Sequence, residues 1–237
     1  MENTNIILTE ASPQRRKNKD GIIDFHTHIL PGIDDGSRDV SESLEMLSSL
    51  RDSGVGTVVF TPHFYPDRTT LDEFLKKRKA AYEKLLPHLD SFDMDVRLGA
   101  EVYFYNGISK SSSIADFKIE GTSYILVEMP FYKWSEQILN DIIELNSHQE
   151  VQVVIAHIDR YLKFVPVKVF EALSRQGIFF QMNIDAMGFW FRARKLKKLL
   201  SNNMIQFFGS DTHNMTVRAP KWEDFKKYNL KPCIDKI

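Results

Sequence analysis

The run Ile-Ile-Asp-Phe-His-Thr-His at residues 22–28 decides how the rest of the chain is interpreted. Its first half is a short apolar stretch of the kind that forms a buried strand. Its second half places two histidines one residue apart, so on a strand both imidazoles point to the same face. Paired imidazoles at the carboxyl end of a strand are typical of metal sites in α/β proteins. Taken alone the pair is a weak signal, because histidines also pack in cores.

Seven apolar runs along the chain have the composition of buried parallel strands. They are nearly continuous in Val, Ile, Leu and Phe, as expected when both faces of a sheet are covered. Helical patterns separate them, so the sequence predicts a parallel β/α barrel or a wound sheet. The predicted strands are 22–26, 57–62, 95–103, 123–129, 151–157, 178–184 and 205–209.

The helices between these strands have recognisable end signals. Asp39 followed by Glu42, and Thr70 followed by Glu73, have the spacing of capping boxes. Pro166 is suited to the first turn of another helix. Two more helices are predicted at 135–146 and 190–201.

Size and charge limit the possible functions. The 237 residues are expected to form one domain at 21–237, after a polar and mobile leader at 1–20. Lysine and arginine number 31 against 32 acids, so no general basic field attracts nucleic acid. The densest basic run, 192–198, is expected to be a solvated helix face, the alternative being a docking face for an acidic partner. No apolar run reaches the length of about 18–20 residues that a membrane span needs, and the predicted location is cytoplasmic.

The single cysteine is not placed as a catalytic thiol would be. Cys233 cannot form an internal disulfide, which fits a reducing compartment. It lies in Lys-Pro-Cys-Ile-Asp-Lys-Ile at the end of the chain, with no phosphate-binding loop ending in arginine after it. A thiol-dependent phosphatase is therefore not expected.

Further histidines and acids follow the other predicted strands, and this coincidence strengthens the signal. Mixed imidazole and carboxylate donors suit manganese, iron or zinc. A carboxylate at a strand end is costly to bury without a counter-ion. The sequence therefore predicts a multinuclear metal site and a metal-dependent hydrolase. The candidates beyond the first histidine pair are Asp34, Asp35, His63, Glu101, His157, Asp211 and His213.

Two arginines stand close behind these candidates. Arg160 follows His157 by three residues, and Arg218 follows His213 by five. A guanidinium group offers fork geometry to two phosphoryl oxygens, so both are predicted to hold phosphate. The alternative is an ordinary surface ion pair for each.

Other polar and aromatic residues near the strand ends allow more than one interpretation. The aromatic stretches 103–105 and 131–134 are expected either to wall a cleft or to belong to the core. Glu128 is a candidate for an extra ligand, an outer base or a plain ion pair. Asp24 is expected to accept a hydrogen bond from a ligand imidazole. His88 and His148 are expected on the surface.

From about residue 22 to residue 220 the motifs resemble the polymerase-and-histidinol-phosphatase (PHP) superfamily. Asp-Phe-His-Thr-His-Ile-Leu-Pro-Gly-Ile-Asp-Asp-Gly-Ser, at 24–37, is similar to the opening of bacterial CpsB/YwqE-type protein-tyrosine phosphatases of capsule and exopolysaccharide biosynthesis. The resemblance implies a distorted seven-stranded β/α barrel. Its later motifs are Gly-Ala-Glu-Val-Tyr at 99–103, Ile-Ala-His-Ile-Asp-Arg-Tyr at 155–161 and Ser-Asp-Thr-His-Asn-Met-Thr-Val-Arg at 210–218.

The resemblance also implies up to three divalent cations, with Mn²⁺ first and iron or zinc as alternatives. Between Glu101 and His157 the only other histidine is His148, at the end of a helical stretch, so the second cation would have few protein ligands. The implied ligands are His26, His28, Glu101 and Asp211 for the first cation, Glu101 and His157 for the second, and Asp35, His63 and His213 for the third.

The implied reaction is hydrolysis of phosphotyrosine on a protein by metal-activated water. Arg160 and Arg218 would orient the phosphoryl group, and a proton from the neighbourhood of His213 would reach the leaving oxygen. The implied substrate is the tyrosine-rich tail of a bacterial tyrosine kinase. The alternatives are a phosphatase of histidinol phosphate or another small molecule, and a non-catalytic regulator that binds phosphotyrosine.

Overall fold

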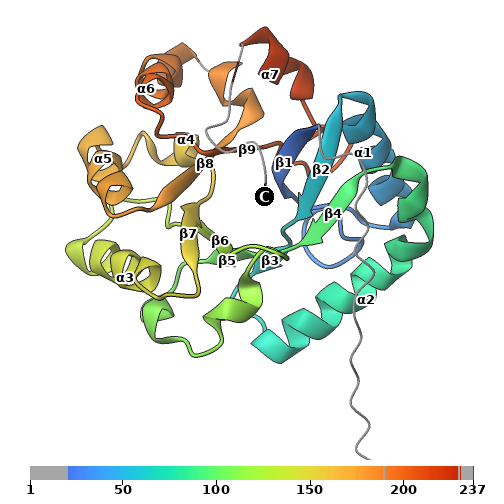
Figure 1. Ribbon diagram of the computed structural model, residues 1–237, viewed down its shortest axis with the longest axis horizontal. Coiled ribbons are helices and arrows are strands. Elements are labelled where there is room, and N and C mark those ends of the chain that lie inside the picture. Colours follow the sequence, from blue (N-terminus) through green and yellow to red (C-terminus); the bar gives the residue numbers. More distant parts are fainter. Residues whose placement is uncertain (1–20, 189, 229, 231–236) are drawn as a thin grey trace, which may run out of the picture.

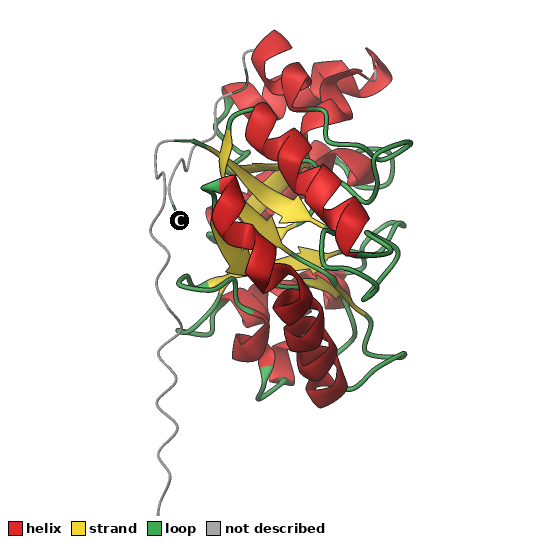
Figure 2. Ribbon diagram, turned by 90° about the vertical axis from the view of Figure 1, so that its right-hand side faces the viewer, coloured by secondary structure: helices red, strands yellow, loops and turns green. Residues whose placement is uncertain are grey.

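The chain forms an α/β structure whose strands surround a common centre and whose helices lie outside them (Figure 1). The computed structural model describes residues 21–188, 190–228, 230 and 237. The predicted leader at 1–20 and Cys233 lie outside these residues. Seen from the side, the strands form the inner part and helices flank them (Figure 2). None of the helices in the described part combines the length and apolar character of a membrane span.

The strands form two sheets in which every pair is parallel. The smaller sheet has the order β1-β2-β4, with β1 at Ile22–Thr27, β2 at Val55–Phe60 and β4 at Asp95–Leu98. The larger has the order β3-β5-β6-β7-β8-β9, and its strands are His63–Phe64, Glu101–Tyr103, Tyr124–Glu128, Gln152–Ile155, Phe179–Asn183 and Phe207–Gly209.

One predicted strand is broken in two and one extra strand is present, which corrects the expected seven-stranded barrel. The run 57–62 forms only β2, which ends at Phe60. A further strand, β3, begins at His63 after Pro62, which has no N–H for the ladder. The run 95–103 becomes β4 and β5, with Gly99 at the break. The described strands therefore form sheets of three and six. The Gly99 N–H donates to the Phe60 carbonyl (2.9 Å) at the end of the β2–β4 ladder, and the Asp211 N–H donates to the His26 carbonyl (2.8 Å), which joins β1 to the segment after β9.

The longer helices lie where the sequence predicts them, and one capping box is only half formed. The Thr70–Glu73 box is present in full. Asp39 accepts the Glu42 N–H, but the Glu42 carboxylate bonds instead to the backbone and side chain of Arg38 (2.9 and 3.0 Å). The helices are α1 (Val40–Asp52), α2 (Leu71–Leu89), α3 (Glu136–Asn146), α4 (Ile158–Tyr161), α5 (Val167–Arg175), α6 (Trp190–Ser201) and α7 (Trp222–Lys227). Short 3₁₀ turns occupy Asp90–Phe92, Ile108–Lys110, Ile114–Phe117 and Ile184–Gly188.

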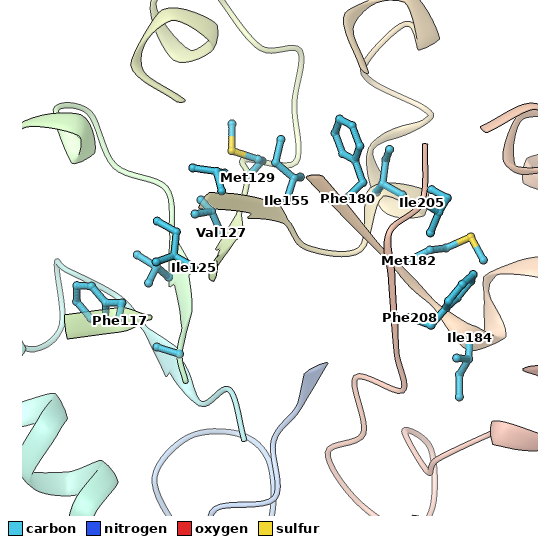
Figure 3. Packing of buried hydrophobic residues seen from close by; sticks show 14 of the residues in the cluster. Phe117, Ile125, Val127, Met129, Ile155, Phe180, Met182, Ile184, Ile205 and Phe208 are labelled. Carbon is cyan, nitrogen blue, oxygen red and sulfur yellow. The ribbon is translucent and has the colours of Figure 1, made fainter. Parts of the chain in front are cut away.

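Both faces of the strands are buried in separate apolar clusters, which explains their nearly continuous apolar sequence. Ile125 and Val127 belong to the larger cluster, part of which is drawn in Figure 3. Leu126, between them on β6, belongs to the smaller one because successive strand residues point to opposite faces. The smaller set, called here the inner cluster, consists of Phe25, Val59, Ile119, Leu126, Val154, Ala156 and Phe207.

Candidate metal centre

The structure brings the eight predicted ligands together around the carboxyl ends of β1, β7 and β9. His26 lies near the end of β1 and His28 just beyond it, whereas His157 and Asp211 follow β7 and β9. Parallel strands put their carboxyl ends at one edge, so residues far apart in sequence meet there. The remaining predicted ligands are Asp35 in the loop after β1, His63 and Glu101 at the starts of β3 and β5, and His213 after β9.

Glu101 is the centre of this arrangement, which is called here the metal centre. Its side chain is 1% exposed, so its charge depends on its neighbours rather than on water. Four imidazoles surround the two carboxylate oxygens. Oε2 lies 3.2 Å from His26 Nε2, 3.3 Å from His28 Nε2 and 3.0 Å from His63 Nδ1, and Oε1 lies 2.9 Å from His157 Nε2.

Asp35 and Asp211 are the other two carboxylates of the predicted set. Asp35 Oδ1 is 3.4 Å from Nε2 of both His63 and His213. Its side chain is 64% exposed, which makes it the predicted ligand most open to solvent. Asp211 Oδ1 lies 3.5 Å from His28 Nε2.

Three groups of donors are compact enough to hold a cation, and they differ from the implied sets in several respects. His28 joins the third set, Glu101 is absent from the first, and His157 belongs to none of the groups. Glu128, at the end of β6, lies 3.4 Å from His157 Nε2 and belongs to one of the groups. The sequence left its role open, because a single glutamate at a strand end has no spacing signal. The groups, each with donor atoms within 4.8 Å of one another, are His28/Asp35/His63/His213, His26/His28/Asp211 and His63/Glu101/Glu128.

Unsatisfied polar atoms concentrate in this centre. Four buried side-chain N or O atoms of the described residues have no hydrogen-bond partner, and all four belong to predicted ligands. Buried polar atoms are normally paired, since an unpaired one costs free energy. A cation accepts the lone pairs of imidazole and carboxylate at the same time, so the donor set fits divalent metal. The atoms are His63 Nδ1, Glu101 Oε2, His157 Nδ1 and His213 Nε2.

The first two histidines are oriented from behind, but not by Asp24. Asp34 Oδ2 lies 2.8 Å from His28 Nδ1, and Gln181 Oε1 lies 3.2 Å from His26 Nδ1. Such outer contacts leave each Nε2 facing the centre, where the two nitrogens are 3.0 Å apart. The expectation for Asp24 was wrong. Its carboxylate accepts backbone N–H groups and the indole N–H of Trp222 (2.9 Å), so it fastens β1 to the chain after β9.

The close packing of imidazoles and carboxylates shifts their pKa values. Burial opposes the charge on His28, but Asp34 and Glu101 outweigh it and raise its pKa to about 9. His63 also has a pKa of about 9, because Glu101 overcomes the effect of burial. Burial raises the pKa of Glu101, yet the imidazoles of His26 and His63 hold it well below its usual range. Protons thus balance the carboxylates in the metal-free protein, and metal binding would release them.

The two predicted arginines share one carboxylate at the edge of the centre. Arg160 Nη2 bonds to Asp211 Oδ2, and Arg218 Nη2 donates to Oδ1 at 2.9 Å. Their side chains are partly exposed, and both line a cavity of about 300 Å³ beside the centre. The remaining N–H groups of the arginines are suited to an anion placed there. The other predicted interpretation, an ordinary surface pair, does not fit a shared buried partner.

Backbone conformation at the centre is unusual. His157 and Asp211 have φ angles of 30° and 53°, in the left-handed region that non-glycine residues rarely adopt. Such strain is found most often at functional sites. Gly209 permits a close approach, because a Cβ there would lie 2.6 Å from His26 Cβ.

The aromatic stretches divide between core and cavity, as the two interpretations allowed. Phe104 and Trp134 are buried in the larger cluster, whereas Phe131 is 41% exposed and lines the cavity. His88 is exposed as predicted. His148 is partly buried and lines a second cavity with Ser109 and nearby residues.

The fold and the donor set define a parallel α/β protein with a site suited to several divalent cations. The chain belongs to the capsular polysaccharide synthesis family CpsB/CapC, whose model matches residues 22–234.

Comparison with curated proteins gives similar names. The chain is 29% identical over 209 residues to tyrosine-protein phosphatase YwqE of Bacillus subtilis, covering 83% of this chain and 79% of that protein. It is 27% identical over 235 residues to tyrosine-protein phosphatase CpsB of Streptococcus pneumoniae, covering 89% and 92%.

A solved structure shares the fold. It belongs to a study of YwqE from Bacillus subtilis and CpsB from Streptococcus pneumoniae, described as unique metal-dependent tyrosine phosphatases. The TM-score is 0.72 at 23% identity, and the match covers 89% of each chain.

Proposed function

We propose that this protein is a metal-dependent phosphatase that hydrolyses phosphotyrosine in a protein substrate. The observation that carries the proposal is the concentration of unpaired buried donor atoms in one centre next to two anion-binding arginines. The names of the curated relatives support the choice of phosphotyrosine.

The proposed cofactors are up to three divalent cations, Mn²⁺ first and iron or zinc as alternatives. Glu128 is added to the second cation, which the sequence alone left with few ligands, because its carboxylate lies beside His157. The proposed assignment follows the distances between pairs of donors and is His26, His28, Glu101 and Asp211 for the first cation, Glu101, Glu128 and His157 for the second, and Asp35, His63 and His213 for the third.

The protein's own groups would position the substrate. When bound, the cations would supply charge neutralisation for the phosphoryl group and an activated water. Arg160 and Arg218 would hold phosphoryl oxygens, since Asp211 fixes both guanidinium groups at the cavity. A tyrosyl oxygen leaves with a pKa near 10, so it needs less protonation than a serine alkoxide.

His213 is proposed as a ligand rather than the proton donor. Its Nδ1 lies 2.9 Å from the backbone carbonyl of Asp211, which requires the proton on that nitrogen. Nε2 therefore presents a lone pair, and it has no hydrogen-bond partner among the described residues. Solvent in the cavity is then the proposed proton source for the leaving oxygen.

We further propose that residues 21–237 act as one domain in which the two sheets form one distorted barrel of seven strand positions. β2 with β3, and β4 with β5, would each count as one position. The backbone hydrogen bonds from Gly99 to Phe60 and from Asp211 to His26 support this arrangement. A crystal structure with an open gap between β1 and β9 would contradict it.

The proposed substrate is the tyrosine-rich tail of a bacterial tyrosine kinase that controls capsule production, encountered in the cytoplasm. The family description, capsular polysaccharide synthesis, supports this choice. Dephosphorylation of such a kinase by purified protein is the direct measurement.

A substrate panel tests the reaction. Purified protein is given a phosphotyrosine peptide, a phosphoserine peptide and histidinol phosphate, with Mn²⁺ or with excess chelator. We expect turnover of the phosphotyrosine peptide that needs Mn²⁺ and is lost with chelator. The Cys233→Ala variant is the control and should keep full activity; its inactivation would restore a thiol mechanism. Preference for histidinol phosphate would favour that alternative, and binding without turnover would favour the regulator.

A further inference from the structure

The cavity next to the arginines has two apolar side chains at its opening. Among the described residues, four large apolar side chains are exposed, and two of them, Phe131 and Val217, line this cavity. Val217 is 83% exposed, so its side chain is accessible to a ligand in the cavity. Pockets for small ligands combine apolar walls with a few polar groups, so these two side chains could contact an apolar part of a ligand.

Polar and apolar lining residues are separated within the cavity. Its inner part consists of buried polar groups, Asp159, Asn183 and Asp211, together with the two arginines. Its outer part includes the apolar pair. A ligand with a phosphoryl group at one end and an apolar body at the other matches this order.

Phe131 packs beside two buried rings of the site. Its ring stacks on the imidazole of His157 with centroids 5.8 Å apart and an interplanar angle of 20°. It also lies against the ring of Tyr161, at 5.5 Å between centroids. One side of the ring is thus fixed by the protein while 41% of the residue remains exposed.

We propose that Phe131 and Val217 form an aryl slot that grips the ring of phosphotyrosine and selects aryl over alkyl phosphates. The inference rests on the proposed function and adds two residues that determine its specificity. A phenyl ring between the phosphoryl group and the peptide backbone fills the apolar part of a cavity of about 300 Å³. A serine side chain is too short to reach the inner donors while its ester carbon covers both apolar groups.

Binding of two phosphonates tests the slot without any chemical step. Phenylphosphonate and methylphosphonate carry the same charged group, and neither is hydrolysed. Competitive inhibition constants are measured on Mn²⁺-loaded protein with para-nitrophenyl phosphate as the reporter. Phe131→Ala is expected to weaken phenylphosphonate about tenfold, the size of an aromatic contact with its buried area. Methylphosphonate should change by less than about twofold.

Val217→Ala is the second variant, needed because Phe131 also touches His157. Val217 is too exposed for its truncation to unfold the protein, and the loss for phenylphosphonate should be about fourfold. Leu86→Ala, an exposed apolar residue on α2, is the matched control and should change neither constant. Lys163→Ala, at the same cavity, should weaken both phosphonates equally because it removes only charge.

The outcomes separate the slot from the proposed function. An unchanged ratio of the two inhibition constants in Val217→Ala and Phe131→Ala overturns the slot. If Phe131→Ala loses metal, measured by elemental analysis, the Val217→Ala ratio alone decides. Wild-type protein that cleaves no phosphotyrosine peptide overturns the proposed function; the slot is then decided by the same two phosphonates, measured by calorimetric titration.

Discussion

The inner cluster and the metal centre are built from neighbouring residues of the same strands, yet they are opposite in character. Phe25 precedes His26, and Ala156 precedes His157. In the inner cluster the side chains pack against one another. The rings of Phe25 and Phe207 are stacked, with centroids 4.0 Å apart and an interplanar angle of 14°. The metal centre instead leaves buried donor atoms without partners.

This difference shows that the inner cluster stabilises the fold by itself, whereas the metal centre needs a ligand to satisfy its donor atoms. Apolar burial needs no ligand, so the inner cluster contributes stability with or without metal. Converging carboxylates and imidazoles cost stability until cations bind, and binding then returns free energy to the folded state. Substitutions in the two regions should therefore have separable effects.

The largest effect is expected at the middle of the metal centre. Glu101→Gln keeps the shape but removes the charge that faces four imidazoles. We expect loss of metal and a fall in kcat of about 1,000-fold, because several kcal/mol of transition-state stabilisation depend on the cations. Phosphatase kinetics and elemental analysis measure both. Glu83→Gln on α2 is the matched control, and equal losses in the two variants would contradict the assignment.

A large effect of the other kind is expected in the inner cluster. Phe207→Ala removes a ring that stacks on Phe25 and contacts Tyr124 at 5.0 Å. The free energy of unfolding should fall by about 3–5 kcal/mol, as for other buried aromatics. Urea denaturation measures this loss. Metal content of the folded protein should stay the same, and if it vanished while stability held, the two regions would not be separable.

An intermediate effect is expected where the two regions meet. A Cβ at Gly209 would lie 2.6 Å from His26 Cβ and 2.9 Å from Gln181 Nε2. Gly209→Ala should cost about 1–3 kcal/mol of unfolding free energy and also weaken metal binding, since His26 must move. Denaturation measures the loss of unfolding free energy, and metal titration measures the loss of metal affinity. Gly188→Ala, whose new Cβ meets nothing closer than 4.0 Å, is the control.

The smallest effect is expected far from both regions. Thr70 caps α2 through the Glu73 N–H, and Thr70→Ala should lower the unfolding free energy by about 1 kcal/mol. Metal content and activity should be unchanged. A drop in activity here would mean that any loss of stability reduces function. The effects of substitutions in the inner cluster and in the metal centre could then not be separated.

Much of the architecture could be predicted, because local sequence patterns specify the strands and the starts of helices. Nearly continuous apolar runs predicted β6 and β8, and the spacing of Thr70 and Glu73 predicted the start of α2. The break inside 95–103 and the extra strand β3 were missed, since an apolar run does not show where a strand changes sheets. The short helices α4 and α7 were missed too, because so few residues carry no periodicity.

For the candidate site, the sequence could supply donors but not their surroundings. Glu128 stayed ambiguous until β6 placed it next to His157, and Gln181 was not noticed because a strand glutamine has no motif. Asp24 was misjudged for the same reason. Its partners, Ser210 and Trp222, lie 186 and 198 residues away in the chain.

By itself, the sequence determined the kind of chemistry, because residue type fixes which atoms donate to a cation and which clamp an anion. It also determined parallel strands, because only two buried faces allow such apolar runs. The tertiary structure alone decided which donors share an ion, which carboxylates serve as supports and where the apolar opening of the cavity lies. Those facts depend on distances between strands, and no local pattern encodes a distance between residues that meet only after folding.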